Sequence, residues 1–145
     1  MGDVSTSGTA RAGLAYALAV FAIGFALGTV RVLLLAPRMG AATAVSIEAP
    51  LMLGASWWIS RRCIRHFRVA RAAPARVLMG AVAFLVLMLE EVALAWSLGS
   101  SPAGYLSSLA SPAGAIGLAA QVAFALIPLA QGLRCCSMRA RSASS

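Results

Sequence analysis

The stretch VLMGAVAFLVLMLEEVALAWSL, residues 77–98, is apolar along almost its whole length and carries two adjacent carboxylates, Glu90 and Glu91, past its middle. A helix rises 1.5 Å per residue, so a helix of this length is about 33 Å long. That length is enough to cross a hydrocarbon core ~30 Å thick. The stretch therefore predicts a transmembrane helix. The two glutamates in it need polar partners within the membrane.

Three further apolar runs are similar in length, and they cover residues 12–36, 41–59 and 113–133. The chain has 145 residues, of which 61% are hydrophobic and 11% are charged. Soluble domains carry about a quarter charged residues, so the composition is that of a membrane protein. We predict an all-α fold, an integral membrane four-helix bundle that forms one domain over residues 12–134. Residues 1–11 and 135–145 are expected to be flexible tails.

The net charge of +8 comes from arginine alone, because the chain has no lysine. Ten of the eleven arginines outside the four runs lie in the two tails and in residues 61–76, whereas Arg38 alone lies on the other side. Positive residues mark cytoplasmic loops. We therefore expect both termini to be cytoplasmic, in a bacterial inner membrane, since the arginine and alanine bias suggests a bacterial genome. The arginines flank the apolar runs, so the expected partner is the lipid bilayer and not nucleic acid.

Aromatic residues near the ends of the runs fit this orientation. Trp57, Trp58 and Tyr16 are predicted at the cytoplasmic interface, and Trp96 and Tyr105 at the outer one. Amphipathic aromatic rings settle at such interfaces.

The strongly polar residues inside the runs are predicted to form one layer in the outer half, consisting of Arg31, Glu48, Glu90 or Glu91, and Gln121. An unpaired charge at mid-helix costs ~2.5–3.5 kcal/mol on insertion scales, so these groups should face one another. Arg31 and Glu48 are the natural pair, on helices joined by a short loop. Helical spacing from Ala83 and Leu87 favours Glu90 as the inward carboxylate. One acid then lacks a protein partner, and it is the candidate for function unless it faces a second protomer.

Two classes of function fit this layer. The first is a non-enzymatic accessory or interaction protein in which the layer holds the bundle or a partner, either as a homo-oligomer or in a larger membrane complex. The second is a small proton- or ion-coupled carrier that uses the surplus glutamate. The first is favoured, because four short helices are expected to enclose little space.

Motifs for an enzyme or a cofactor are missing from the sequence. There is no phosphate-binding loop, dinucleotide fingerprint or metalloprotease motif, and His66 is the only histidine. Cys63, His66, Cys135 and Cys136 are the residues that could form a zinc site. Adjacent cysteines do not match the usual ligand spacing, and the surrounding arginines would repel a cation, so no metal site is predicted.

The segments GTVRVLLLAPRMG (28–40), IEAPLML (47–53) and SWWISRRCIRHF (56–67) resemble a group of small four-span bacterial inner-membrane proteins of unassigned function. The resemblance covers mainly the first two runs and the basic segment. It implies a four-span fold in the inner membrane and no particular activity.

Overall fold

The computed structural model describes the backbone of residues 6–142 and the side chains of residues 6–133, and this part of the chain is all-helical. The first helical segment consists of α1 (Thr6–Val30), the π-helical turn η1 (Arg31–Leu35) and α2 (Ala36–Met39). It ends at Gly40, whose φ of +84° lies in the left-handed region that glycine adopts without strain. α3 (Ala41–His66) then runs back beside it.

The second half of the chain contains α4 (Ala73–Ser97), the short α5 (Pro102–Leu109) and α6 (Pro112–Ser142). The tetrapeptide SPAG occurs at 101–104 and again at 111–114, and each copy starts a helix. In each copy the serine hydroxyl accepts a hydrogen bond of 3.1 Å from the glycine amide, at Gly104 and Gly114. Serine at the N-cap followed by proline is a helix-start signal, so α5 could have been predicted from the sequence.

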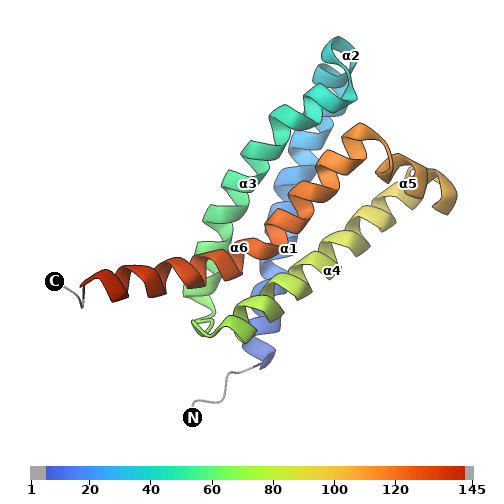
Figure 1. Cartoon of the computed structure of the whole chain (residues 1–145). Coiled ribbons are helices and arrows are strands. Elements are labelled where there is room, and N and C mark those ends of the chain that lie inside the picture. Colours follow the sequence, from blue (N-terminus) through green and yellow to red (C-terminus); the bar gives the residue numbers. More distant parts are fainter. Residues whose placement is uncertain (1–5, 143–145) are drawn as a thin grey trace.

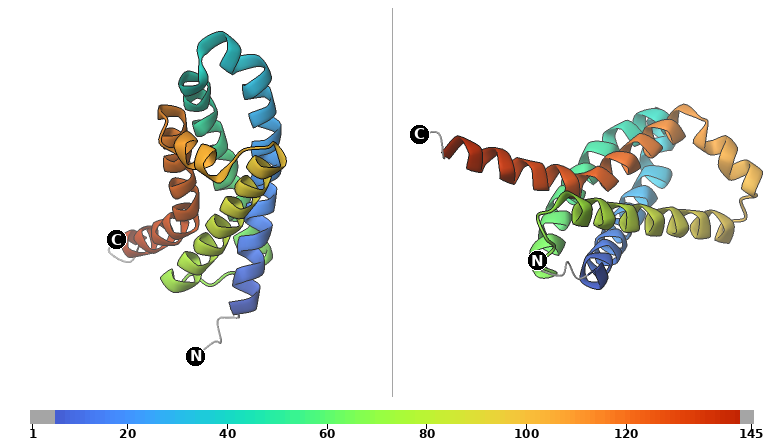
Figure 2. Two further views of the ribbon diagram at one scale, coloured as in Figure 1. Left: turned by 90° about the vertical axis from the view of Figure 1, so that its right-hand side faces the viewer. Right: turned by 60° about the horizontal axis from the view of Figure 1, so that its bottom comes forward.

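The four long helices form a ring in which each packs against two others (Figure 1, Figure 2). α1 and α6 each contact both α3 and α4. The start of α1 and the loop of residues 67–72 lie at one end of the ring, which we call the basic end. α2 and α5 lie at the opposite end, the α2/α5 end. The last part of α6 runs away from the other helices, and Pro128 inside this helix removes a backbone hydrogen bond and favours a bend.

The packed core occupies the half of the bundle nearer the basic end. Its central side chains are fully buried and include Tyr16, Met79 and Ala83. Two glycines let helices approach closely here. A Cβ at Gly13 would lie 2.7 Å from the carbonyl oxygen of Met79, and one at Gly80 would lie 2.1 Å from that of Ala125. Small residues at helix contacts are the expected packing device in membrane proteins.

Three helical segments of the described chain are long and apolar enough to cross a membrane, namely Thr6–Met39, Ala73–Ser97 and Pro112–Leu133. They overlap three of the four predicted runs, and each begins before its predicted run. The run predicted at 41–59 lies in α3, which is long but is not among these three, because Glu48 and other polar residues such as the serines lower the mean hydropathy of this run.

The basic segment, residues 61–76, is more helical than a loop between two membrane runs would be. α3 continues to His66 and α4 begins at Ala73, so only residues 67–72 form the connection. Arg76 is buried, and its Nε donates a 2.9 Å hydrogen bond to the carbonyl oxygen of Ala70, which fastens this connection to α4. One of the ten arginines therefore has a structural role within the fold.

Candidate functional site

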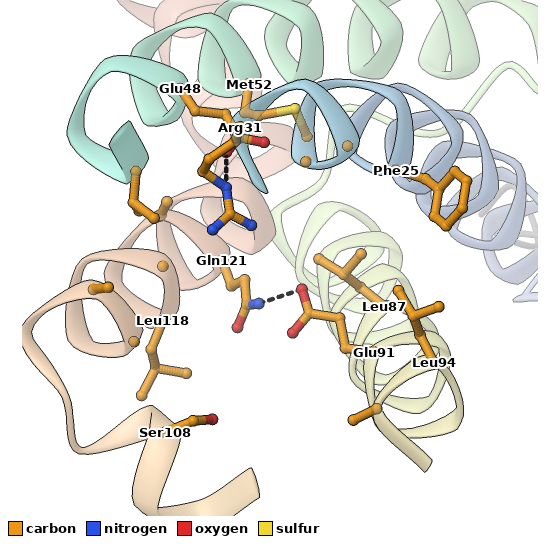
Figure 3. A pocket seen from close by; sticks show the side chains of 18 of the residues that line it. Phe25, Arg31, Glu48, Met52, Leu87, Glu91, Leu94, Ser108, Leu118 and Gln121 are labelled. Atoms are coloured by element: carbon orange, nitrogen blue, oxygen red, sulfur yellow. Dashed lines mark hydrogen bonds and ion pairs between the residues drawn. The ribbon is translucent and has the colours of Figure 1, made fainter. Parts of the chain in front are cut away.

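The helices separate toward the α2/α5 end and surround a cavity of about 870 Å³. Side chains from α1, η1, α3, α4, α5 and α6 line it (Figure 3). We call it the outer cavity. This volume is in the range of small-molecule sites, which measure roughly 300–1,000 Å³. The expectation that the bundle encloses little space is wrong, because the core closes only one half of the ring.

An ion pair between Arg31 and Glu48 forms one wall of the outer cavity. It joins Arg31 Nε to a carboxylate oxygen of Glu48, and it is the partnership that the sequence predicts. The Nε–H group is not aligned as a hydrogen bond, so the contact is ionic. The remainder of the guanidinium points toward Gln121 (Figure 3), which leaves its other nitrogen atoms on the cavity side.

A widened helical turn begins at Arg31. In η1 the backbone N–H of Ala36 donates to the carbonyl oxygen of Arg31, five residues earlier. Pro37 follows directly, and a proline ring in a regular helix clashes with the carbonyl four residues before it. The wider turn avoids that clash, and single π-helical turns of this kind frequently occur at functional sites.

Glu91 and Gln121 form the facing pair, from α4 and α6. Gln121 Nε2 donates a 2.5 Å hydrogen bond to a carboxylate oxygen of Glu91 (Figure 3). Arg31 is close enough for its charge to act on the same carboxylate. All four long helical segments therefore contribute at least one polar residue to the cavity.

The prediction that Glu90 is the inward carboxylate is wrong. Glu91 lines the outer cavity together with Leu87 and Leu94, whereas Glu90 does not line it. Spacings of three and four residues both share a helix face, and the packing of α4 against α1 and α6 selects the series 87, 91 and 94. Glu90 is half-buried, and its Oε2 has no hydrogen-bond partner among the described residues.

Besides Arg31 Nε, which is in the ion pair, two polar atoms at the cavity have no hydrogen-bond partner in the described part of the chain, Gln121 Oε1 and the hydroxyl of Tyr105. Burial, together with the charge of Glu91, raises the pKa of the Tyr105 hydroxyl further above neutral pH, where a tyrosine hydroxyl is in any case protonated and able to donate. Sequence reasoning placed Tyr105 only at the interface, because α5 was not anticipated.

The charges and the walls of the outer cavity define the molecules that fit it. One guanidinium, Arg31, stands against two carboxylates, Glu48 and Glu91, which leaves one negative charge when both acids are ionised. Phe25, Leu118 and other apolar side chains form most of the remaining wall (Figure 3). Such a site suits a molecule with one positive group and an apolar body.

A second set of polar contacts lies near the basic end and was not predicted. Gln131 Nε2 donates a 2.8 Å hydrogen bond to the carbonyl oxygen of Trp57, and Ser60 donates one of 3.2 Å to Gln131 Oε1. Gln131 lies inside an apolar run, as Gln121 does, so the same signal was available. The polar residues therefore form two levels and not the single layer expected.

Tyr16 belongs to the core and not to the membrane interface. Its ring stacks on Phe124 with centroids 4.4 Å apart, and its hydroxyl donates a 3.1 Å hydrogen bond to the carbonyl oxygen of Phe124. A tyrosine with a hydrogen-bonded hydroxyl can be fully buried. Trp58 and Trp96, at opposite ends, are 58% and 59% exposed, as residues at membrane surfaces would be.

Residues 6–133 contain no group of three or more side chains that could hold a metal ion. Cys63 is a buried free thiol in this part of the chain. Cys135 and Cys136 lie outside the residues whose side chains are described. The zinc site considered from the sequence is therefore not tested by the structure.

Comparison with protein-family models, with curated proteins and with solved structures found no match to this chain. The resemblance to small four-span membrane proteins therefore remains a prediction from the sequence.

Proposed function

We propose that the chain is a multi-pass, four-helix protein of the bacterial inner membrane that binds and carries a small organic cation in the outer cavity. The observation that carries this proposal is the cavity of about 870 Å³, whose apolar walls surround the Arg31–Glu48 and Glu91–Gln121 pairs. This ranks the carrier above the accessory protein, because a polar layer that served only to hold helices together would not need a space between them.

The surface of α3 supports it as the fourth membrane segment. Its outward residues include Ile47, Leu51 and Trp58, whose exposed fractions are 45%, 59% and 58%. Its inward side carries Glu48, and buried Ser56 and Ser60. Glu48, Ser56 and Ser60, three of the polar residues that lower its hydropathy, therefore face the bundle, while an apolar stripe faces outward, where lipid would lie.

Glu91 is the proposed binding group for the cation. Its carboxylate lies inside the cavity, and the unpartnered Gln121 Oε1 beside it can accept a hydrogen bond from an ammonium group. A proton and an organic cation would compete for Glu91, which is the simplest form of proton coupling. Arg31 would hold Glu48 in its ion pair, so that Glu91 alone is free to exchange ligands.

A matched pair of probes and a matched pair of variants test the proposal. Naphthylmethylammonium should bind the purified protein, and neutral naphthylmethanol should bind more weakly. Glu91→Gln should weaken ammonium binding at least about tenfold, because a hydrogen bond to a charged group contributes ~1.5–3 kcal/mol. Glu90→Gln makes the same change one residue away, outside the cavity lining, and should bind like the wild type.

Liposomes that contain the protein then separate binding from transport. Uptake of the ammonium probe should be driven by an outwardly directed proton gradient in the wild type and abolished by Glu91→Gln. If Glu91→Gln and Glu90→Gln lost binding of the ammonium probe equally, or if the wild type bound the alcohol as tightly as the cation, Glu91 would not be the binding group for the cation. Binding without uptake would leave a ligand-binding protein and refute the carrier.

The accessory function remains the second candidate, because the same polar residues also connect helices. The Arg31–Glu48 pair joins η1 to α3, and the Glu91–Gln121 bond joins α4 to α6. If this is their only role, neither probe should bind, and Glu91→Gln should lower the stability of the protein without a transport defect.

A further inference from the structure

A hollow at the basic end of α3 has the chemistry of a phosphate-binding site. It has a volume of about 280 Å³ and is lined by Trp57, Trp58, Arg61, Arg62 and Arg65. We call it the Trp–Arg hollow. Residues 58, 61, 62 and 65 follow helical spacing, so they share one face of α3. The guanidinium carbon of Arg62 lies 4.4 Å from the ring centroid of Trp58, in a cation–π contact.

Carboxylates that could neutralise these arginines lie elsewhere in the described chain. Its acidic residues are Glu48, Glu90 and Glu91, all of them toward the α2/α5 end, and Asp3 lies outside the described residues. Arg61, Arg62 and Arg65 are exposed. Three guanidinium groups within five residues of one helix therefore have no carboxylate partner among the described residues, and guanidinium groups bind phosphate oxygens in bidentate geometry.

The surface next to the hollow indicates which phosphate would bind. The exposed stripe of Ile47, Leu51 and Trp58 runs along α3 and ends at the arginines. A phospholipid has the same arrangement, with acyl chains that can lie along the apolar stripe and a phosphate that reaches the guanidinium groups. Tryptophan at the junction is typical of the membrane interface.

We propose that the Trp–Arg hollow binds the phosphate of an anionic phospholipid, with the acyl chains lying on the outer face of α3. This site is separate from the outer cavity, and it requires that the chain lies in a bilayer but not that it carries a ligand. An anionic lipid is favoured over a zwitterionic one, because a choline group would bring a positive charge toward the three arginines.

Quenching of tryptophan fluorescence by brominated lipid tests this site directly. The protein has three tryptophans, so Trp96→Phe confines emission to Trp57 and Trp58 beside the hollow. This variant is reconstituted in phosphatidylcholine that contains a small fraction of either acyl-brominated phosphatidylglycerol or acyl-brominated phosphatidylcholine. Brominated phosphatidylglycerol should quench more at an equal mole fraction, because it accumulates at the hollow.

Two double variants with equal loss of charge provide the control. Arg61→Gln with Arg65→Gln, within the hollow, should abolish the preference for phosphatidylglycerol. Arg68→Gln with Arg71→Gln removes two exposed arginines outside the hollow. This variant should retain the preference for phosphatidylglycerol. If both double variants lost the preference for phosphatidylglycerol equally, the lipid would be attracted to the basic surface in general, and the site would be refuted. The site would also be refuted if the Trp96→Phe protein showed no preference for phosphatidylglycerol. If inorganic phosphate removed the preference in this protein, a free phosphate ligand would replace the lipid.

Discussion

Arg31 and Glu48 show how a single ion pair can determine which helices meet. Their side chains are only 30% and 13% exposed, and they lie beside the apolar part of the outer cavity. An ionised group that loses its partner in such a place keeps the cost of desolvation without the compensating attraction. The intact pair therefore contributes little net stability, whereas removal of one partner destabilises the protein.

Replacement of one partner should be more harmful than replacement of both. Arg31→Ala should lower the free energy of unfolding by up to about 3 kcal/mol, because it leaves Glu48 without its counter-charge. Arg31→Leu combined with Glu48→Leu should recover most of this loss. Reversible unfolding in mixed detergent micelles gives both values. A double variant that is no more stable than Arg31→Ala would show that the two side chains do not depend on each other.

At the scale of helices, close backbone contacts hold α4 against α6 and α1. Gly80 is the tightest of them, since a Cβ there would meet the backbone carbonyl of Ala125 and not a flexible side chain. A backbone atom cannot move away without a shift of α6 as a whole. The position of α4, and with it the direction of Glu91, therefore depends on a residue without a side chain.

Gly80→Ala should destabilise the protein by about 1–3 kcal/mol, the usual effect of overpacking, although alanine is the better helix former. Gly54→Ala is the matched control, because no atom of the described residues beyond its own stretch of helix backbone lies within 4 Å of a Cβ at Gly54, and the change should be neutral or slightly stabilising. Thermal unfolding of both variants in detergent makes the comparison. Equal midpoints would mean that α4 and α6 do not approach as closely as the structure places them.

At the scale of the whole molecule, the bundle is tightly packed in one half and open in the other. The core lies toward the basic end, and the outer cavity lies toward the α2/α5 end. Under the orientation that the arginines predict, the packed half would be cytoplasmic and the cavity would open in the outer half of the membrane. The native thiol Cys63 cannot report this orientation, because it is buried and burial raises the pKa of the thiol, which keeps it unreactive on either side.

Exposed engineered thiols can report the orientation. In a protein that lacks Cys63, Cys135 and Cys136, Ala103→Cys on α5 should react with a membrane-impermeant maleimide applied to whole spheroplasts. Ala72→Cys, which is exposed in the loop at the basic end, should react only after the membrane is permeabilised. The reverse labelling pattern would place the cavity on the cytoplasmic side and would overturn the predicted orientation.

The amino-acid sequence by itself determined the four long helices and their most polar contact. Apolar runs separated by turn signals are sufficient to predict long helices, because the backbone must satisfy its own hydrogen bonds in an apolar setting. The high cost of an unpaired charge was also sufficient to predict that Arg31 meets Glu48. The first conclusion depends on the length of each apolar run, and the second on the cost of an unpaired charge. Neither quantity depends on how the helices are arranged.

Only the tertiary structure decided which glutamate faces inward and whether the helices enclose a cavity. Glu90 and Glu91 are both compatible with the periodicity of α4, so the choice depended on how α1 and α6 pack against it. Tyr16 is in the core because Phe124, 108 residues away, offers a ring and a carbonyl group. The outer cavity exists because the helices separate beyond that core, and the angle between packed helices depends on contacts along their entire length.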